Sequence, residues 1–552
     1  MQSLKKRIPF FLLLFLANQA WSQSPERLQV HFDKPFYVAG EDIWFSIYFQ
    51  NASEEMQSNI VRLEWLSPDG RVVERQKLAI DGQVASGDLA IPYDWSEGNY
   101  AFRAHTVWNL NFSNTPFYER IIPIYNLLET PQIAERPEEN ANEPQTLETW
   151  NNLRIEGATT AQQYRRRETV KVTIQLKNGA GNLTKGQFSV AVTDNNYLPN
   201  TFFSNGNGFS ERIGDFQNKY AAEADLLVNG QLKNPSGELV DTRFLSIYLP
   251  TQKKFVKTIV SKGQLNAALP KYQGTQPLQL FDMNPFHEPI PTFEIEEVKV
   301  RQPYESAPLL RSEVAANYLF LLSKYRQYRE TFNLPTPNYN LAQPNEKPIW
   351  TYDRAWDMEQ YTALSDLASF VAEVIPGGRV VNQKGKRTIR LQYAEKSLYN
   401  RLSPWYLVNG WLTEDEDVVL KIPFRAVETV EMFNSKKTIA NQLDPSMVSR
   451  GLLSITTKDR KTPDAITNKP NNVQWSGLYP IRQFPKLPLT NDKIPDFRPL
   501  VYWNPTIETD ENGRATFEFI TSDGIGIHQI KIMGINENGQ LGEQVISYEV
   551  IR

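Results

Sequence analysis

Hydrophobic and polar residues alternate in short runs along most of the chain. Apolar side chains occupy every second position in Leu28–Phe32, Ile43–Phe49 and Val170–Leu176. A period of two places one face of a strand against a core, so these runs predict β-strands. Segments with proline and glycine, such as Asp33–Glu41, separate the runs and turn the chain. The pattern predicts a mainly β, multidomain protein built from a string of sandwiches.

The first sandwich is predicted over residues 24–126. Its segment FDKPFYVAGEDIWFSIYF starts at Phe32, and a later strand starts within EGNYAFRAHT at Glu97. Both segments resemble the second macroglobulin domain of the alpha-2-macroglobulin family, whose members are protease traps with a reactive thioester. The thioester requires a cysteine, and this sequence contains none. The resemblance therefore implies the immunoglobulin-like β-sandwich module without the trap chemistry.

Two further β units are expected in the middle of the chain. Residues 150–205, which include the alternating strand Phe188–Val192, resemble a second macroglobulin-like sandwich. Residues 225–296, with a turn at Gly237, are similar to the carboxypeptidase regulatory-like domain. That resemblance implies a small non-catalytic sandwich of a kind often found as an extension of outer-membrane transporters. We expect this unit to be complete by residue 296.

A terminal β-sandwich segment is predicted over residues 495–552, after a proline-rich linker. Asp510–Gly513 predicts a tight hairpin turn in which glycine supplies the positive φ, and Phe517 and Phe519 alternate inward. An Asp-x-Asn-Gly run also occurs in calcium loops, but such a loop needs a bidentate acid at its twelfth position, where this chain has Thr521. We therefore predict a turn and no calcium site.

A change of period between residues 306 and 345 predicts a helical connector. Its apolar positions recur at helical spacing, and we expect that face to pack on a neighbouring sheet; it comprises Val314, Tyr318, Leu321, Leu322 and Tyr325. The charged face offers a partner surface as the alternative, with Arg311, Lys324, Arg326 and Arg329. The basic triplet Arg165–Arg167 is likewise interpreted as a solvated strand edge, with a docking patch for acidic lipid or protein as the alternative.

Residues 350–460 predict an α+β unit. A short helix near Ser365–Glu373 precedes three strands, Trp405–Val408, Val427–Phe433 and Leu452–Thr457. The segments PWYLVNGWL, IPFRAVETVEMFNSKK and SRGLLSITTKDRK resemble the plug domain of TonB-dependent receptors. A receptor continues into a barrel of many strands, whereas 92 residues follow Arg460 here. The resemblance therefore implies a plug-like module that docks on another protein's barrel.

The N-terminus predicts export. Residues 1–22 combine the basic Lys5–Arg7, an apolar core and small residues before Gln23, which is the pattern of a secretory signal peptide. The apolar core is too short to span a bilayer, and no later segment is long and apolar enough. The polar stretch Glu129–Thr149 is interpreted as a linker. We expect a periplasmic or outer-membrane-associated protein, with the cell surface left open and no direct membrane span.

Composition removes several classes of chemistry. Without cysteine there is no lipobox anchor, disulfide, thiolate nucleophile or Cys-ligated zinc. A net charge of −4 gives no nucleic-acid footprint. The four histidines, His31, His105, His287 and His528, are far apart in sequence, and the common metalloprotease, hydrolase and nucleotide motifs are missing. We assign no catalytic, cofactor-binding or metal residues and expect no cofactor and no enzyme; binding residues stay unknown.

Three functional classes follow from these features. The first is a scaffold or interaction subunit that binds an outer-membrane β-barrel protein or a multi-subunit outer-membrane complex. The second is a surface glycan-binding or adhesion protein, for which exposed tryptophan and tyrosine would be the sign. The third is a macroglobulin-type protease-binding protein without the thioester. The sequence favours the first class and does not identify the partner, the membrane face, the ligand or the oligomeric state.

Overall fold

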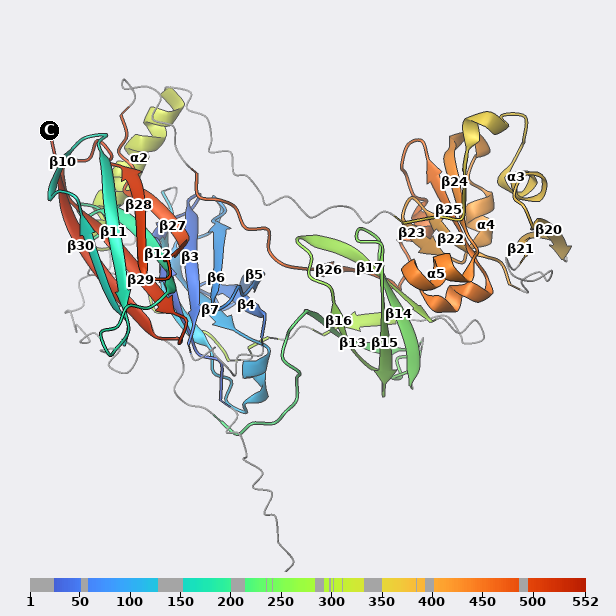
Figure 1. The fold of residues 1–552 in the computed structure, drawn as a ribbon, viewed down its shortest axis with the longest axis horizontal. Coiled ribbons are helices and arrows are strands. Elements are labelled where there is room, and N and C mark those ends of the chain that lie inside the picture. Colours follow the sequence, from blue (N-terminus) through green and yellow to red (C-terminus); the bar gives the residue numbers. More distant parts are fainter. Residues whose placement is uncertain are drawn as a thin grey trace, which may run out of the picture.

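A computed structural model gives the fold of most of the chain. It describes residues 24–50, 58–127, 152–199, 214–234, 236–240, 242–282, 292–296, 299–300, 302–309, 311–331, 350–383, 385–392, 402–485 and 495–552. The predicted signal peptide 1–22 and linker 129–149 lie outside these residues. The described chain forms an elongated molecule with a β-rich lobe at one end, a β arm in the middle and an α+β unit at the other end (Figure 1). The mainly β multidomain fold class is confirmed.

The first sandwich pairs a three-stranded sheet, β1-β3-β6, with a five-stranded sheet, β2-β8-β7-β4-β5. Its core contains Phe45, Trp65 and Phe102, whose rings meet at centroid distances between 4.8 and 6.2 Å. The strands are β1 Leu28–Phe32, β2 Tyr37–Val38, β3 Asp42–Phe49, β4 Ile60–Leu66, β5 Val72–Ala79, β6 Val84–Ala90, β7 Gly98–His105 and β8 Tyr118–Tyr125, with the 3-10 helix η1 at Trp108–Asn111.

The second sandwich is assembled from two distant parts of the chain. One sheet has the order β10-β30-β29-β12-β27 and the other β28-β11-β9, so strands before residue 195 pair with strands after residue 499. Val172 lies opposite Phe517, and Ser189 lies opposite Met533. The strands are β9 Arg154–Thr159, β10 Gln163–Arg165, β11 Thr169–Lys177, β12 Gly186–Asp194, β27 Leu500–Glu508, β28 Arg514–Ile520, β29 Gly526–Asn536 and β30 Leu541–Ile551.

This assembly corrects the expectation of separate sandwiches at 150–205 and 495–552. Alternation correctly predicted the inward side chains of β11 and β28, which share one core. It could not reveal that the two segments complete each other. The turn at Asp510–Gly513 is also confirmed, since Gly513 has φ +65° and its N–H donates to Asp510 O at 2.9 Å.

The two sandwiches are stacked through the sheets β1-β3-β6 and β10-β30-β29-β12-β27. His31 Nδ1 lies 2.6 Å from Ser189 Oγ, and Tyr48 OH donates to Met533 O at 2.8 Å. Trp44 packs with Trp503 in the same contact. Almost every residue of β3 is therefore buried, although alternation predicted only one buried face.

The arm is a seven-stranded sheet with the order β18-β13-β16-β15-β14-β17-β26. Its last strand, β26, comes from residues 472–476, so the unit predicted at 225–296 is not complete by residue 296. Trp475 of β26 packs into the arm's core. The strands are β13 Leu226–Lys233, β14 Arg243–Leu249, β15 Lys254–Ser261, β16 Gln264–Leu269, β17 Thr275–Asp282, β18 Thr292–Ile295 and β26 Asn472–Ser476.

The distal unit, defined here as the described residues from 350 to 468, carries a mixed sheet with the order β19-β24-β25-β22-β23. Three strands occupy the predicted positions: β22 Trp405–Val408, β24 Val427–Phe433 and β25 Leu452–Thr457. The other elements are β19 Arg354–Asp357, β20 Gly378–Gln383, β21 Lys386–Leu391, β23 Trp411–Thr413, α3 Leu367–Glu373, α4 Glu416–Leu420, α5 Lys436–Gln442, α6 Asp464–Thr467, η3 Met358–Tyr361, η4 Phe424–Ala426 and η5 Pro445–Ser449.

Helix α2, Glu313–Thr331, is the described part of the predicted connector. Its buried face packs on the first sandwich and on Leu198 of the second, which confirms packing on a neighbouring sheet. Tyr318 meets Phe36 edge-on at 5.2 Å. Part of the charged face, which was the alternative partner surface, also binds the first sandwich. Arg311 pairs with Glu97, and Arg326 donates to Ala39 O at 2.7 Å.

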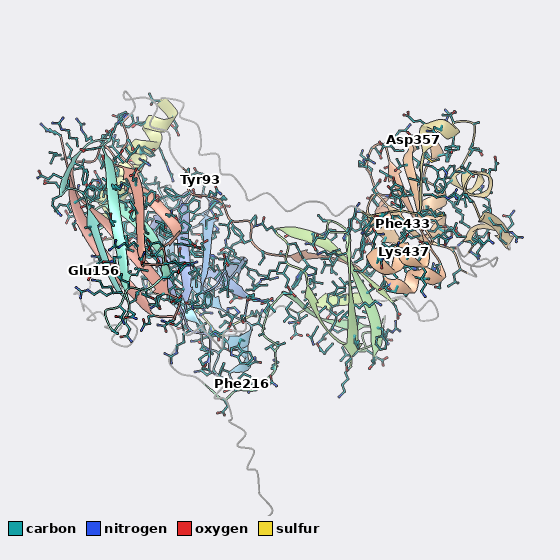
Figure 2. The ribbon with its side chains drawn as sticks, viewed as in Figure 1. Tyr93, Glu156, Phe216, Asp357, Phe433 and Lys437 are labelled. Carbon is teal, nitrogen blue, oxygen red and sulfur yellow. The ribbon has the colours of Figure 1, made fainter. Side chains whose placement is uncertain are left out.

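Three connecting segments, here called straps, also bind the first sandwich. Strap 1 (residues 214–223) places Phe216, labelled in Figure 2, against Phe112 and Trp108, with ring centroids 5.4 and 5.1 Å apart. Strap 2 (residues 302–309) accepts a hydrogen bond from Arg103 Nη1 at Gln302 O, at 2.6 Å. Strap 3 (residues 477–485) begins the predicted proline-rich linker, yet Tyr479 N donates to Lys77 O at 2.8 Å and Arg482 pairs with Asp42 and Asp88 of the first sandwich. Helix α2 and all three straps therefore pack on the first sandwich.

Candidate functional site

The described histidines are buried in separate parts of the fold. His31 lies between the stacked sandwiches, and His105 lies on the outer face of the first sandwich beside Arg62, which binds Glu223 of strap 1. Burial, with Arg62 and Arg103 nearby, lowers the pKa of His105 to about 3. Burial also lowers the pKa of His31 well below its usual value, helped by Lys531 and Arg120. Both rings are therefore neutral packing groups at physiological pH. His287 lies outside the described residues.

One constellation has the composition of a hydrolase triad. Ser522 Oγ lies 3.5 Å from His528 Nε2, and Asp194 Oδ2 lies 4.0 Å from the same nitrogen. In a triad the carboxylate orients the imidazole through the second ring nitrogen, but Nδ1 of His528 faces Gly526 O at 3.2 Å. All three side chains are buried. This arrangement suits packing and cannot deliver a nucleophile to a substrate.

No group of three or more histidine, aspartate or glutamate side chains in the described part of the chain is arranged to hold a metal ion. The carboxylate of Asp510 is engaged in its own turn, where Oδ1 accepts from the N–H groups of Asn512 and Arg514 at 2.9 and 2.8 Å. These contacts agree with the predicted turn. Among the described helices, none is long and apolar enough to cross a membrane.

The distal unit is docked firmly on the arm. Tyr248 and Phe281 of the arm pack against Trp405, Phe433 and other apolar residues of the distal unit. The side-chain amide of Gln279 in β17 binds the backbone of Leu412 as a neighbouring strand would. Its Nε2 donates to Leu412 O at 3.1 Å, and its Oε1 accepts from Leu412 N at 2.8 Å. Since Gln279 is 1% exposed, these bonds are shielded from water. The contact is both apolar and directional, so we treat arm and distal unit as one rigid part.

Replacing Gln279 with alanine should loosen this junction. The change leaves the backbone N–H and C=O of Leu412 buried without partners, which costs about 1–3 kcal/mol. Hydrogen exchange should accelerate at β22 and β23, with little change in the first sandwich. Gln474→Ala, an exposed glutamine on the neighbouring strand β26, serves as the matched control. Equal exchange in both variants would show that the apolar contact alone holds the junction.

A basic surface forms at the strand ends opposite those that carry Trp405, Phe433 and Leu452. The ends of β22, β24 and β25 meet there, as Val408 lies opposite Ile455 and Val427 opposite Thr457. Lys458 N donates to Ala426 O at 2.8 Å, which brings two loops together. We name this the strand-end surface; its exposed basic residues are Lys421, Arg425, Lys458, Arg460 and Lys461. Asp357, at the top of the distal unit in Figure 2, lies on the neighbouring edge strand β19.

The loop and turn at this surface are well ordered by hydrogen bonds. Asn409, with φ +49°, donates through Nδ2 to Thr457 Oγ1 at 2.8 Å and to Lys461 O at 2.9 Å. Thr457 N donates back to Asn409 Oδ1 at 2.8 Å. Arg460 pairs with Glu428 at 2.6 Å, and the exposed Asp459 interacts with Lys461, so two of the five charges are partly balanced. The surface is a preformed positive patch that suits an acidic partner.

Asp353 fixes the opposite end of the distal unit. Its carboxylate accepts from the N–H groups of Asn434 and Ser435 at 2.6 and 2.7 Å and from Thr438 Oγ1 at 2.6 Å. Burial alone would raise the pKa of Asp353, but these hydrogen bonds outweigh burial and hold the pKa below its usual value. The ionised carboxylate therefore stabilises the start of α5.

We expect acid to weaken this anchor. Because the folded-state pKa of Asp353 is depressed, its contribution is present above the unfolded pKa of about 4 and is lost as the pH falls through the folded value. The difference in melting temperature between wild type and Asp353→Asn should therefore shrink as the pH drops below about 4. Asp464→Asn, an exposed aspartate on α6, is the control. A difference that stays constant with pH would show that the carboxylate charge plays no part.

The basic triplet Arg165–Arg167 is divided between two roles. Arg165 closes the short edge strand β10, in agreement with the predicted strand edge. Arg167 adopts φ +60° and forms a bidentate pair with Asp523 at 2.9 and 2.7 Å, so it is structural.

The strand-end surface was missed by sequence reasoning, although the run Lys458–Lys461 marks part of it. Only folding brings Arg425 to that run.

Comparisons with known proteins give a limited result. No protein-family model and no curated protein matches the chain. Among solved structures, alpha-2-macroglobulin from Salmonella, reacted with methylamine, has 9% identity and a TM-score of 0.25, covering 96% of this chain and 39% of that one. Elastase-activated alpha-2-macroglobulin from Escherichia coli has 9% identity and a TM-score of 0.25, covering 95% and 44%. A putative membrane anchored protein from Corynebacterium diphtheriae has 11% identity and a TM-score of 0.15, covering 46% and 53%.

The chain thus spans less than half the length of the alpha-2-macroglobulins it matches. At these identities and scores nothing about function follows from the similarity.

Proposed function

We propose that this chain is an exported, non-enzymatic interaction subunit of a bacterial cell envelope, whose distal unit binds an outer-membrane β-barrel protein or a complex that contains one. The observation that supports the proposal best is the strand-end surface, a preformed basic patch at the ends of β22, β24 and β25 opposite Trp405, Phe433 and Leu452. The rigid junction at Gln279 would hold this patch in a fixed orientation. Pre-ordering lowers the entropic cost of binding.

The chemistry of the partner follows from charge. Arg460 pairs with Glu428, and Lys461 interacts electrostatically with the Asp459 carboxylate. The exposed charges of Lys421, Arg425 and Lys458 would be complemented by an acidic face. The sequence resemblance of residues 350–460 to a receptor plug points to the wall or rim of a barrel as that face. The predicted signal peptide supplies the route to the envelope. No catalytic step is required for this role.

An affinity pull-down tests the proposal. Tagged mature protein is incubated with detergent-solubilised outer membranes, and proteins recovered in stoichiometric amounts are identified by mass spectrometry. We expect a β-barrel protein with the wild type and a loss of about tenfold with Arg425→Glu/Lys458→Glu, because rim charges act on association. Arg165→Glu/Arg166→Glu, an equal charge change on exposed residues of the second sandwich, should leave recovery unchanged.

Two other outcomes would redirect the assignment. If the Arg165/Arg166 variant alone loses the barrel, the partner binds the second sandwich and not the distal unit. If no barrel is recovered with wild type, the interaction-subunit proposal is wrong, and glycan or protease binding becomes the better assignment. For glycan binding the surface offers the exposed tyrosines Tyr93, Tyr328 and Tyr352, while no tryptophan among the described residues is exposed.

A further inference from the structure

Strand β28, Arg514–Ile520, forms one edge of the second sandwich. It pairs with β11 at the end of the sheet β28-β11-β9, in the β-rich lobe of Figure 1. Among the described residues, no strand pairs with its other side. Such an edge presents a row of N–H and C=O groups to any extended segment that can reach it.

The ladder between β11 and β28 identifies the backbone groups on this free side. Thr521 N donates to Glu168 O at 3.0 Å, and Leu176 N donates to Gly513 O at 2.8 Å. In an antiparallel ladder, bonded pairs recur at every second residue. The residues whose N–H and C=O groups point away from β11 are therefore Arg514, Thr516, Glu518 and Ile520.

The free side of β28 is open to solvent. The side chains of the same four residues are exposed, and that of Ile520 is 42% exposed. The carbonyl of Arg514 accepts from Asp510 N at 2.8 Å, within the preceding turn. In the part of the chain that the structure describes, nothing bonds to the outward N–H and C=O groups of Thr516 and Glu518.

The other edges of this sandwich are protected against pairing. β9 lies against β30 of the opposite sheet, β10 has three residues, and β27 contains Pro505 and two register shifts against β12. Short strands, prolines and bulges are the usual means by which sheets avoid edge-to-edge association. β28 has seven residues, no proline and no register shift, and it is rich in β-branched and aromatic residues. A segment of this composition and low net charge pairs readily.

The edge of β28 is complementary to a second copy of itself. A two-fold axis at Phe517 would pair the two strands antiparallel and place Thr516 of each copy opposite Glu518 of the other. Each of these two pairs would exchange both of its backbone hydrogen bonds. Arg514 would lie diagonally across from Glu518 of the other copy, within reach of a long side chain, so opposite charges would meet twice.

We propose that two copies of this chain pair through β28 and join their second sandwiches in one continuous sheet. The contact is isologous and closes on itself, so it forms a dimer and not a fibre. Seven residues from each copy make a small interface, and we expect the dimer to dissociate on dilution. The mirrored charges of Arg514 and Glu518 favour a second copy over an unrelated strand. This proposal does not depend on the function proposed for the distal unit.

Sedimentation velocity of the full mature chain over a range of concentrations tests the charge pairing. We expect a monomer–dimer equilibrium for the wild type. Glu518→Arg leaves two positive charges on each edge and should weaken dimerisation about tenfold. Arg514→Glu/Glu518→Arg restores opposite charges and should recover the dimer. Glu508→Arg, the same charge change at an exposed residue of β27, should leave the equilibrium unchanged.

Thr516→Pro tests the backbone pairing. Since Thr516 N–H points away from β11, proline removes no bond of the β11–β28 ladder, but it removes a donor that the second copy needs. We expect this variant to be monomeric, with a melting temperature close to that of the wild type.

Three results would overturn the proposal. A wild-type chain that stays monomeric up to about 1 mM does not pair with itself. A dimer that survives both Thr516→Pro and Glu518→Arg is formed by another surface. Slow hydrogen exchange at the amides of Thr516 and Glu518 in the dilute monomer would show that the chain itself covers this edge. Each of these results leaves the barrel pull-down unaffected, because Arg425 and Lys458 lie in the distal unit.

Discussion

Deleting β27–β30 should unfold β9–β12 as well, although these strands lie more than 300 positions earlier in the chain. The core of the second sandwich contains Val172 and Phe188 from the first segment and Phe517 and Ile532 from the second. Without the second segment, β12 loses both neighbours in its sheet, β27 and β29. The remaining strands cannot bury their apolar face. Limited proteolysis with mass spectrometry should find new cleavage sites between residues 152 and 199.

The complementary variant joins the two segments directly. Asp194 N donates to Pro499 O at 2.9 Å, so the ends of the two segments are close together. The variant therefore consists of residues 152–199 and 495–552 joined by a short Gly-Ser linker. We expect this chain to fold alone into a β-sandwich with a cooperative thermal transition, as one complete core is present. If the truncated protein keeps β9–β12 protected, or the joined chain stays unfolded, the composite sandwich is not an autonomous unit.

Substituting Arg482 with methionine should strongly destabilise the first sandwich and the attachment of strap 3 to it. The guanidinium binds Asp88 Oδ2 at 2.5 Å and Asp42 Oδ1 at 2.8 Å, and the Asp88 side chain is 0% exposed. Removing one member of a buried ion pair costs about 3–5 kcal/mol, because the other charge is left without compensation. Thermal unfolding of the first sandwich should report the loss.

The pH dependence separates charge from packing. Burial raises the pKa of Asp88, and Arg482 opposes that rise. Without Arg482 the carboxyl should protonate at higher pH, so the defect of Arg482→Met should shrink as the pH falls and protonation removes the uncompensated charge. The double variant Asp88→Asn/Arg482→Met should recover part of the stability at neutral pH. A defect that is independent of pH and unrelieved in the double variant would mean that strap 3 is held by packing of Phe484 and its neighbours.

Local patterns predicted the elements of this fold well. The bounds of β22, β24 and β25 were predicted, and so were the inward faces of β11 and β28. Alternation reports which side chains of a strand face a core, because successive side chains point to opposite sides. It carries no information about which distant strand lies alongside. The separate sandwiches at 150–205 and 495–552 and the early completion of the arm were wrong for this reason.

Contacts between units were the second limit of sequence reasoning. Polar residues such as Ser46 and Tyr48 point to solvent in a pattern analysis, yet both donate to backbone carbonyls of the second sandwich, at 2.8 Å each. Gln279 and Arg482 gave no signal, because a lone glutamine or arginine in a β-rich segment is ordinary on a surface. A run of charge, as at Lys458–Lys461, is visible, but its neighbours in space are not.

The interrupted second sandwich has a consequence for the order in which the molecule matures. A chain that emerges from its N-terminus presents β9–β12 long before β27–β30 exist, because all strands of the arm and of the distal unit lie in between. Pairings of such long sequence separation form slowly and leave apolar edges uncovered in the meantime. The last strands therefore complete the second sandwich. A chain whose synthesis stops, or that is cleaved, before Leu500 would expose the apolar face and the unpaired edges of β9–β12. Such a chain would be marked out for capture by chaperones or proteases before it could reach a partner.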